Sequence, residues 1–329
     1  MNISKIAKLS GVSPATVSRY LNNGYVSEEK KERIKKVIEE TGYIPSPSAQ
    51  TLRTKKNNIL GVIVPKISSE SISKMVQGIT TELKNTKYNI ILANTDNSPD
   101  KELEFLSIFK NNTVDGVILI GTILTRKHHQ IINEYAKPIV LLGQFDKNVS
   151  CVYYDDFGAS YGCTEKLIKC GCKKIAYIGV TPKDKSAGKS RLDGFNSALC
   201  DNGLTVNPKL MSESDFNSEG GYQAMERLLT ISEPFDGLFC ATDNIALGAM
   251  KSLREHGINI PKDVKIVSIG DSKVAKFCSP TLSSAHLYYV TGGKEACKLL
   301  LDTLENDNRI IKQHRLGYEI FNRQTTEIE

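Results

Sequence analysis

Few side chains in this 329-residue sequence have the spacing that catalysis or metal binding requires. The adjacent pair His128-His129 falls in a stretch of helical pattern without cysteine or carboxylate partners at ligand spacing, so we expect solvated imidazoles. Residues 158–162 lack both the GxGxxG pattern and a P-loop lysine, and indicate neither a dinucleotide nor ATP. The sequence has no nucleophile with an evident histidine partner. We therefore expect no enzyme activity, no cofactor and no metal.

Cations are concentrated in one short stretch that could bind an anion. Lys183, Lys185, Lys189 and Arg191 lie within nine residues, directly after a predicted strand at 174–180. Ammonium and guanidinium groups are common partners of phosphate. The alternative is a solvated loop in which only Arg191 points toward a ligand. The spacing leaves both interpretations open.

The first nineteen residues have the pattern of two short helices joined by a tight turn. Gly11 suits the turn because it lacks a Cβ atom. Ser13 is a predicted N-cap, and Pro14 follows at the first helical position, where its missing N–H is no loss. Val17 then faces inward and leaves the polar side chains of the second helix outward. This is the pattern of a helix-turn-helix with a short recognition helix.

The net charge of the chain lies at the same end. Residues 1–56 contain 11 Lys and Arg against 5 acidic residues, whereas the remaining residues contain 32 of each. Binding to phosphates requires such an excess of cations. The lysines between residues 30 and 36 could instead be the solvated face of a third helix, which is predicted over 28–41. The balance nevertheless predicts that residues 1–56 bind nucleic acid.

Bulk properties favour a globular protein of two or three domains. Hydrophobic residues make up 40% of the chain, which is ample for a buried core. The longest apolar runs are far shorter than the roughly 20 residues of a membrane span. The chain starts with a polar helical pattern rather than an apolar signal stretch, so we expect it in the cytoplasm. The eight cysteines show no paired CxxC spacing and are expected to be reduced and mostly buried.

From residue 58 onward, short runs rich in Val and Ile alternate with amphipathic stretches of helical length. This alternation predicts an α/β fold of parallel sheets with crossover helices. The number of runs favours two sheets, with a break near residues 153–156. The predicted strands span 59–64, 89–95, 115–121, 138–144, 174–180, 237–243 and 265–271. Residues 282–329 are predicted to add one strand, a helix and a tail strand that return the chain to both lobes.

These features together resemble the LacI/GalR family of bacterial transcriptional repressors over essentially the whole chain. The most specific stretches are Thr16-Val17-Ser18-Arg19, Gly42-Tyr43-Ile44-Pro45, Asp115-Gly116-Val117-Ile118 and residues 240–249. Within the family the chain is similar to trehalose operon repressors, through residues 151–156, 188–191 and 268–271.

The resemblance implies a division of the chain into a DNA reader and a core. Residues 1–56 would form a helix-turn-helix DNA-binding domain with a hinge helix at about 46–53. Residues 57–329 would form an effector-binding and dimerisation core similar to periplasmic binding proteins. Its lobe 1 would comprise about 58–156 and 286–315, and its lobe 2 about 157–285 and 316–329. The protein would then be a homodimer that represses a sugar-utilisation operon from a palindromic operator.

The resemblance also implies site residues, position by position. Those expected to contact DNA are Ser4, Ser13, Ala15, Thr16, Ser18, Arg19, Asn22, Ser48, Ala49, Leu52 and Arg53. Those expected to contact the effector are Lys66, Ser68, Gln144, Lys189, Arg191, Phe216, Asp243, Asp271 and Tyr289. At the crossover between lobes, Asp155 or Asp156 is expected to cap the following helix rather than to contact the ligand.

Two positions, Gly270 and Lys66, indicate the chemical class of the effector. Gly270 stands where lactose-type members carry an aspartate, a departure that trehalose repressors share. Those repressors bind a phosphorylated disaccharide and place a cation where Lys66 stands. A sugar phosphate such as trehalose 6-phosphate is therefore the expected effector, with a neutral disaccharide such as sucrose as the alternative. A sugar-binding protein or an α/β enzyme with a regulatory DNA-binding segment is the remaining alternative, and the sequence supplies no acid–base pair for the enzyme.

Leu52 matches the leucine that the family wedges into the central base step of its operator. Unstacking a base step costs roughly a few kcal/mol, which is offset by the contacts that a kinked site allows. We predict that Leu52→Ala weakens binding to the specific operator much more than binding to random DNA, as measured by gel shift at one salt concentration. Equal losses on both DNAs would show that Leu52 is not a wedge.

Overall fold

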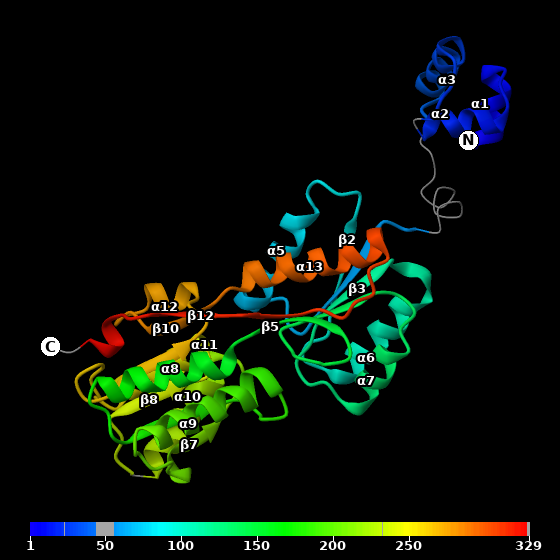
Figure 1. The fold of residues 1–329 in the computed structure, drawn as a ribbon. Helices are drawn as coiled ribbons and strands as arrows, with labels where there is room; N and C mark the ends of the chain where they lie inside the picture. The colour runs from blue at the N-terminus through cyan, green and yellow to red at the C-terminus, as the bar shows by residue number, and fades with distance from the viewer. Residues whose placement is uncertain (23, 44–55, 232, 328–329) are drawn as a thin grey trace. The chain divides into compact units, whose positions relative to one another are not determined.

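The structure is a computed structural model that describes residues 1–22, 24–43, 56–231 and 233–327. The chain forms two compact units, Met1–Asn57 and Asn58–Glu329, which are taken separately below (Figure 1). The predicted hinge helix at 46–53 lies outside the described residues. So do four of the predicted DNA contacts, which are Ser48, Ala49, Leu52 and Arg53.

The described part of the first unit contains three helices around a small core. They are α1 (Ile3–Ser10), α2 (Pro14–Leu21) and α3 (Glu28–Thr41). Ile6, Val17 and Ile34, one from each helix, are fully buried against one another. Each helix thus contributes an apolar stripe to one common core and leaves its polar face to solvent.

The turn between α1 and α2 is held by hydrogen bonds from both sides. Gly11 adopts the left-handed conformation, with φ of +64°. The hydroxyl of Ser13 accepts the Thr16 N–H at 3.2 Å, which confirms the predicted N-cap. From α3, Arg33 donates through Nε and Nη2 to the Ser10 carbonyl at 3.0 and 2.7 Å. The predicted helix-turn-helix is therefore confirmed, and α3 fixes its turn.

Two six-stranded sheets form the second unit. We call lobe 1 the sheet of order β11-β5-β4-β3-β1-β2 with its helices, and lobe 2 the sheet of order β12-β10-β9-β8-β6-β7 with its helices. In lobe 1 the strands, in sheet order, are Gln313–Leu316, Ser150–Tyr154, Ile139–Leu142, Gly116–Ile120, Ile59–Val64 and Asn89–Asn94. In lobe 2 they are Tyr318–Phe321, Ser283–Leu287, Lys265–Ile269, Gly237–Cys240, Ile175–Gly179 and Met211–Glu213. Neighbouring strands are parallel except for β12, which is antiparallel to β10.

Helices connect and cover the strands of each sheet (Figure 1). Those of lobe 1 are α5 (Glu70–Leu83), α6 (Pro99–Ile108), the π-helix η1 (Phe109–Thr113), α7 (Arg126–Asn133) and α13 (Tyr289–Asn306). Those of lobe 2 are α8 (Asp156–Lys169), the π-helix η2 (Lys185–Ser190), α9 (Arg191–Asp201), α10 (Ser218–Thr230), α11 (Asp243–Glu255) and α12 (Lys273–Phe277), with the 3-10 turns η3 (Pro208–Leu210) and η4 (Gln324–Thr326). The predicted α/β fold with two parallel sheets is confirmed.

The sequence pattern missed some edge elements. β7 has only three residues, none of them buried, so no apolar run marks it. The segment predicted as one tail strand forms two, β11 and β12, whose alternating half-exposed residues pair with different sheets. An inner strand, β5 between β11 and β4, is also absent from the predicted strands; it has five residues and ends at the break between the lobes. Edge strands have one solvated side, and their hydrophobic signal is correspondingly weak.

The chain crosses between the lobes at three places. It passes from β5 into α8 at Asp155, from β10 into α13 at Tyr288, and from β11 into β12 at Gly317. The red segment in Figure 1 runs along both lobes and contains β11 and β12. Three chain segments therefore connect the lobes, and one cluster of buried hydrophobic residues extends over both.

The expectation of solvated imidazoles at His128-His129 was wrong. His128 is fully buried, with Nε2 at 3.2 Å from Oε1 of Glu102 and Nδ1 at 2.7 Å from the hydroxyl of Thr125. His129 places Nδ1 at 2.6 Å from Oδ2 of Asp146. The N-terminal turn of α7 directs His128 inward, where it completes a capping box with Thr125. No cluster of three or more metal-binding side chains occurs among the described residues.

The cysteines and the helices add two further observations. Every cysteine is free, and six of the eight are buried. Within the described ranges, each helix is too short or too polar to cross a lipid bilayer.

Helices α5 and α13 approach each other closely through glycines. A Cβ atom on Gly78 of α5 would lie 2.1 Å from the carbonyl oxygen of Val290. A Cβ atom on Gly293 of α13 would lie 2.0 Å from the carbonyl oxygen of Met75. Both distances are well inside van der Waals contact, so backbone packs on backbone here. This contact attaches the first helix of lobe 1 to the helix that returns from lobe 2 (Figure 1).

We predict that Gly293→Ala lowers the free energy of unfolding of the second unit by about 2–3 kcal/mol, because overpacked cores must shift backbone. The control is Gly317→Ala, where an added Cβ meets nothing within 4 Å and should change stability by less than about 0.5 kcal/mol. Urea unfolding of the full chain, followed by circular dichroism, measures both. Equal stabilities for the two variants would contradict the close helix contact.

Candidate functional site

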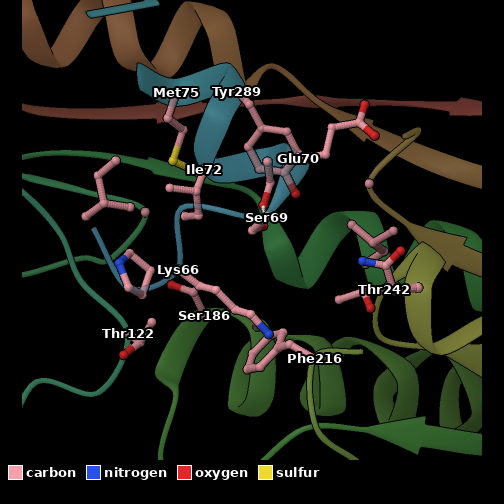
Figure 2. A pocket seen from close by; sticks show the side chains of 18 of the residues that line it. Lys66, Ser69, Glu70, Ile72, Met75, Thr122, Ser186, Phe216, Thr242 and Tyr289 are labelled. Carbon is pink, nitrogen blue, oxygen red and sulfur yellow. Dashed lines mark hydrogen bonds between the residues drawn. The ribbon is translucent and has the colours of Figure 1, made fainter. Parts of the chain in front are cut away.

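A cavity of about 350 Å³ lies where the carboxyl ends of the two sheets face each other. Its walls come from the segments that follow β1, β3 and β4 in lobe 1 and β6, β7, β8 and β9 in lobe 2. Ligands of open parallel sheets bind at this end of the strands. The volume falls in the range of small-molecule sites. Figure 2 shows side chains that converge on it from both lobes.

Seven of the nine predicted effector residues line this cavity. They are Lys66, Ser68, Gln144, Arg191, Phe216, Asp243 and Tyr289. The other two, Lys189 and Asp271, are not brought to the cavity wall.

Lys189 lies on the outer face of the helical segment. Its ammonium pairs with the carboxylate of Asp193, one helical turn further on, and both side chains are about half exposed. Neither Lys183 nor Lys185 lines the cavity. Among the four clustered cations only Arg191 lines the cavity. This agrees with the alternative in which the loop is solvated and only Arg191 points toward a ligand. The reason is helical: the segment from 185 onward winds as η2 and α9, so its side chains point in several directions.

Asp271 turns away from the cavity because its backbone is left-handed, with φ of +45°. Its buried carboxylate contacts Arg323, the Lys276 ammonium at 3.1 Å and Nδ1 of His286 at 3.1 Å. Burial alone raises the pKa of Asp271, but the hydrogen bonds from Arg323 and Lys276 outweigh it and lower the pKa below its usual value. The role of Asp271 is therefore to attach β12 to the loop after β9.

Arg191 forms the charged floor of the cavity together with Asp156. Its Nε and Nη2 donate to Oδ1 of Asp156 at 2.8 and 2.7 Å, and Nη1 donates to the carbonyl of Ala241. Both side chains are almost fully buried. Burial lowers the pKa of Arg191, but the adjacent carboxylate outweighs it and raises the pKa. Burial also raises the pKa of Asp156, and Arg191 offsets part of that shift. The helix cap at this crossover is Asp155, which accepts the Gly158 N–H at 3.0 Å.

Gln144 and Asp184 connect the lobes beside the floor. The Gln144 amide donates to Oδ1 of Asp184 at 2.9 Å, and its oxygen accepts the Ser186 hydroxyl at 3.1 Å. The same Asp184 oxygen accepts the N–H groups of Ser186 and Ala187 at 3.0 Å each. Burial raises the pKa of Asp184, although these hydrogen bonds counteract the shift. Gln144 from lobe 1 is thus bound to the start of η2 in lobe 2.

Asp243 is held by lobe 2 alone. Its carboxylate accepts the hydroxyls of Ser268 and Ser284 at 2.6 Å each and the Ser272 N–H at 2.7 Å. Gly270 passes beside it, and a Cβ there would lie 2.9 Å from Oδ2. The glycine at this position, with φ of +146°, therefore fits both the backbone and the neighbouring carboxylate.

One charged group of the wall, the Lys66 ammonium, is available to a ligand. Figure 2 shows Lys66 pointing into the cavity from the segment after β1. Its ammonium has no ion-pair or hydrogen-bond partner within the described ranges. The hydroxyls of Tyr154 and Ser272 have no hydrogen-bond partner among the residues described, but both oxygen atoms are buried below the cavity surface, and the Tyr154 hydroxyl lies against Gly292 of α13. Phe216 is 38% exposed at the wall, and Tyr289 packs edge-on against Tyr154 with ring centroids 5.1 Å apart.

Sequence reasoning missed several lining residues, chiefly Glu70, Thr122, Tyr154 and Ser186. Thr122 follows a predicted strand, and its position at the strand's carboxyl end was the signal that could have found it. Glu70 and Ser186 lie inside helical turns, where nothing in the pattern marks the face that points to the cavity. They are found only when the two lobes are placed together.

In the first unit, the predicted DNA contacts lie on and beside α2. Ala15 and Arg19 are exposed, as is Ser4 on α1, whereas Thr16 and Ser18 are half-buried. Two of the exposed residues also act within the helix ends: the hydroxyl of Ser13 is the N-cap of α2, and the amide of Asn22 donates to the Ser18 carbonyl. A contact with DNA from Ser13 or Asn22 would use the remaining hydrogen-bonding capacity of its side chain. The predicted DNA contacts among the described residues of this unit are Ser4, Ser13, Ala15, Thr16, Ser18, Arg19 and Asn22.

Comparison with known families matches both units. A family model described as "Bacterial regulatory proteins, lacI family" matches residues 2–46, and one described as "Periplasmic binding protein-like domain" matches residues 164–326. Among solved structures, a complex of transcriptional regulator CelR with cellobiose aligns at a TM-score of 0.77 and 27% identity, covering 99% of both chains. Lac repressor bound to operator aligns at a TM-score of 0.89 with 20% identity, which shows the fold.

Curated relatives cover nearly the full length of the chain. The HTH-type transcriptional regulator RegA of Clostridium saccharobutylicum is 32% identical over 99% of this chain and 99% of its own. The sucrose operon repressor of Staphylococcus xylosus is 30% identical over 97% of this chain and 99% of its own. A DNA reader joined to a periplasmic-binding-type core defines a class of ligand-responsive transcriptional regulators, not enzymes. This chain belongs to the lacI family of bacterial regulatory proteins.

The Asp271 cluster should make stability depend on pH. With Asn at this position the paired cations lose a buried anion, so Asp271→Asn should lower the free energy of unfolding by about 2 kcal/mol at pH 7. Because the native pKa is depressed, the contribution is complete above the unfolded pKa of about 3.9 and is lost as the pH falls through the native pKa. The difference between wild type and variant should therefore shrink on acidification, as followed by urea unfolding between neutral and acidic pH.

The control for that experiment is Asp215→Asn, at an exposed acid whose carboxylate contacts no other described side chain. It should leave the pH profile unchanged. A wild-type advantage over Asp271→Asn that stays constant with pH would contradict the ion cluster.

Proposed function

We propose that this chain is a sequence-specific repressor of a sugar-utilisation operon, whose affinity for the operator is controlled by a small carbohydrate bound between its lobes. One observation carries the proposal: the core joined to the lacI-type DNA reader encloses a polar cavity of about 350 Å³ at the carboxyl ends of both sheets. The protein would bind a palindromic operator as a homodimer, because the helix-turn-helix reads half-sites in pairs. The exposed part of α2, with Arg19, would read the major groove, and Leu52 would enter the minor groove.

Carbohydrate fits the lining of the cavity. The exposed ring of Phe216 offers an apolar face to a sugar ring, and the exposed Ser68 on the wall offers a hydroxyl that can hydrogen-bond to sugar hydroxyls. Carboxylates on the wall, such as Asp243, retain lone pairs that accept hydroxyl donors. Relatives point to the same class of ligand: CelR is solved with cellobiose, and a lacI-family regulator of Enterococcus faecium with ribose.

A phosphorylated sugar, of the kind that trehalose operon repressors take, is favoured by Lys66. The other charged groups of the wall have partners, as Glu70 has Lys74 and Asp156 has Arg191. Lys66 is exposed at the wall, and an ammonium without a protein partner there can bind an anionic ligand group. Lys66 would therefore bind the phosphate while the hydroxyl-lined part of the cavity binds the sugar.

A neutral disaccharide such as sucrose is the second candidate, and one observation favours it. Four acids, Glu70, Asp156, Asp184 and Asp243, line the cavity against three cations, Lys66, Lys74 and Arg191, so the described lining is acidic overall. The lysines at 183, 185 and 189 do not offset these acids at the wall. An acidic lining accepts hydroxyls well and repels a phosphate that comes close.

Regulation would follow from closure of the two lobes around the ligand. A ligand that touches both walls binds the closed arrangement better than the open one and shifts the equilibrium toward it. If operator DNA also prefers one arrangement, effector and operator change each other's affinity by the same factor. Binding of labelled promoter fragments, compared with random DNA by fluorescence anisotropy in the presence and absence of sugars, tests this proposal. Equal binding to both DNAs under all conditions would overturn it.

Calorimetric titration of the full chain distinguishes the two effectors. We expect trehalose 6-phosphate to bind at least about ten-fold more tightly than trehalose or sucrose, the size of one charge-assisted hydrogen bond. Lys66→Met should remove this preference, while its affinity for the neutral sugars stays within about two-fold. Lys66→Arg, which keeps the charge, should retain most of the preference.

Tighter binding of sucrose or trehalose than of the phosphate by the wild type would establish the neutral alternative. A preference for phosphate that survives in Lys66→Met would show that another cation binds it.

A further inference from the structure

We propose that Glu70 is a positioning residue that holds the effector cavity closed by binding a backbone N–H of the opposite lobe. Glu70 lies in the first turn of α5 in lobe 1, beside the cavity. Its two carboxylate oxygens accept the N–H of Lys273 at 3.2 and 3.1 Å. Lys273 is the first residue of α12 in lobe 2, so this bond connects the lobes at a distance of 203 residues in sequence.

Glu70 is built to stay charged at this position. Lys74, one turn later on α5, donates to Oε1 at 2.8 Å, and the Glu70 side chain is 31% exposed. Burial raises the pKa of Glu70, but the hydrogen bonds from Lys74 and from the Lys273 N–H outweigh it and lower the pKa below its usual value. A charged acceptor makes the stronger hydrogen bond. The Lys273 N–H, at the start of α12, has no acceptor within its own helix, so Glu70 satisfies it.

The bond belongs to lobe closure rather than to the interior of either lobe. Glu70 is fixed in lobe 1, because α5 packs closely against α13 through Gly78 and Gly293. Lys273 is fixed in lobe 2, because its neighbour Ser272 donates its N–H to Asp243. Rotation of one rigid lobe against the other must therefore break the Glu70 contact. The separate contact of Gln144 with Asp184 would break in the same motion.

The bond sets how readily the cavity opens, and hence how fast an effector enters and leaves. This inference concerns the regulation of the site proposed above. Its test uses the protein without effector, so it succeeds or fails independently of the ligand's identity. The labelled residues of Figure 2 place Glu70 with Ser69 at the start of α5, near Tyr289, at the wall of the cavity.

Amide hydrogen exchange of the full-length, ligand-free chain measures the opening. Exchange through an opened state reports the population of that state. When the lobes open, Asp184 loses the Gln144 amide, and η2, whose N–H groups bind Asp184, loses the support of lobe 1. In Glu70→Ala we therefore expect the amides of residues 184–190, which do not contact Glu70, to exchange about five-fold faster, as loss of one partly exposed charge-assisted bond implies. A change confined to residues 270–277 would mean that Glu70 only caps α12 and would overturn the proposal.

Position 273 offers a matched pair of variants. Lys273→Ala removes the exposed side chain and keeps the N–H, so exchange at 184–190 should change by less than about two-fold. Lys273→Pro removes the N–H at the first helical position, where proline is tolerated, and should reproduce the five-fold increase of Glu70→Ala. The reverse order of these two effects would overturn the proposal, because the side chain would then be the partner.

The double variant Glu70→Ala/Lys273→Pro completes the cycle. Since both changes remove one bond, the double variant should exchange about five-fold faster, like either single variant. A product of about 25-fold would show that the two residues act independently and that no such bond holds the lobes. Circular dichroism of each variant verifies that the fold is intact.

Discussion

The organisation of the core depends on one buried ion pair. Arg191 and Asp156 are both almost fully buried, and neither charge could remain there without the other. The pair joins the first residue of α9 to the first residue of α8, and Arg191 also binds the end of β8 through the Ala241 carbonyl. Three segments of lobe 2 are thereby fixed at the point where the chain arrives from lobe 1. Breaking these contacts would leave a buried charge without a partner, so they hold the floor of the cavity in place.

The neighbouring buried acids also have hydrogen-bond partners within the protein. Asp184 and Asp243 are buried and each accepts at least three hydrogen bonds from the protein. Such groups shape the cavity and orient its remaining lone pairs. The charged group left over for a ligand is one whose capacity the described part of the fold does not use, namely the Lys66 ammonium. Accessible polar groups without a partner in the described protein therefore indicate which ligand groups the cavity could bind.

Two rigid lobes with few direct bonds between them are suited to a two-state response. Within lobe 1, α5 and α13 meet backbone to backbone, which leaves little room for gradual deformation. Between the lobes, Glu70 and Gln144 each make a polar contact beside the cavity. Three chain segments act as the hinge. Closely packed bodies joined by breakable polar contacts move as units. A ligand bound at the junction can therefore act on the whole second unit.

The sequence by itself determined the class of fold, the helix-turn-helix, and the end of the sheets at which a ligand would bind. These depend on local signals: an N-cap at Ser13, apolar runs of strand length, and the position of Gln144 or Asp243 at the end of a run. Local signals did not predict the burial of His128, because that burial depends on the Glu102 carboxylate of another helix.

Only the tertiary structure decided which polar residues reach the cavity and which serve the fold. Asp271 and Lys189 looked equivalent to their neighbours in sequence. A left-handed backbone turned the first toward Arg323, and the turn of a helix carried the second to the surface. Glu70 carried no signal at all, because its partner is a backbone group of the other lobe. A side chain's direction depends on the neighbours that satisfy its charge, and those neighbours are distant in the chain.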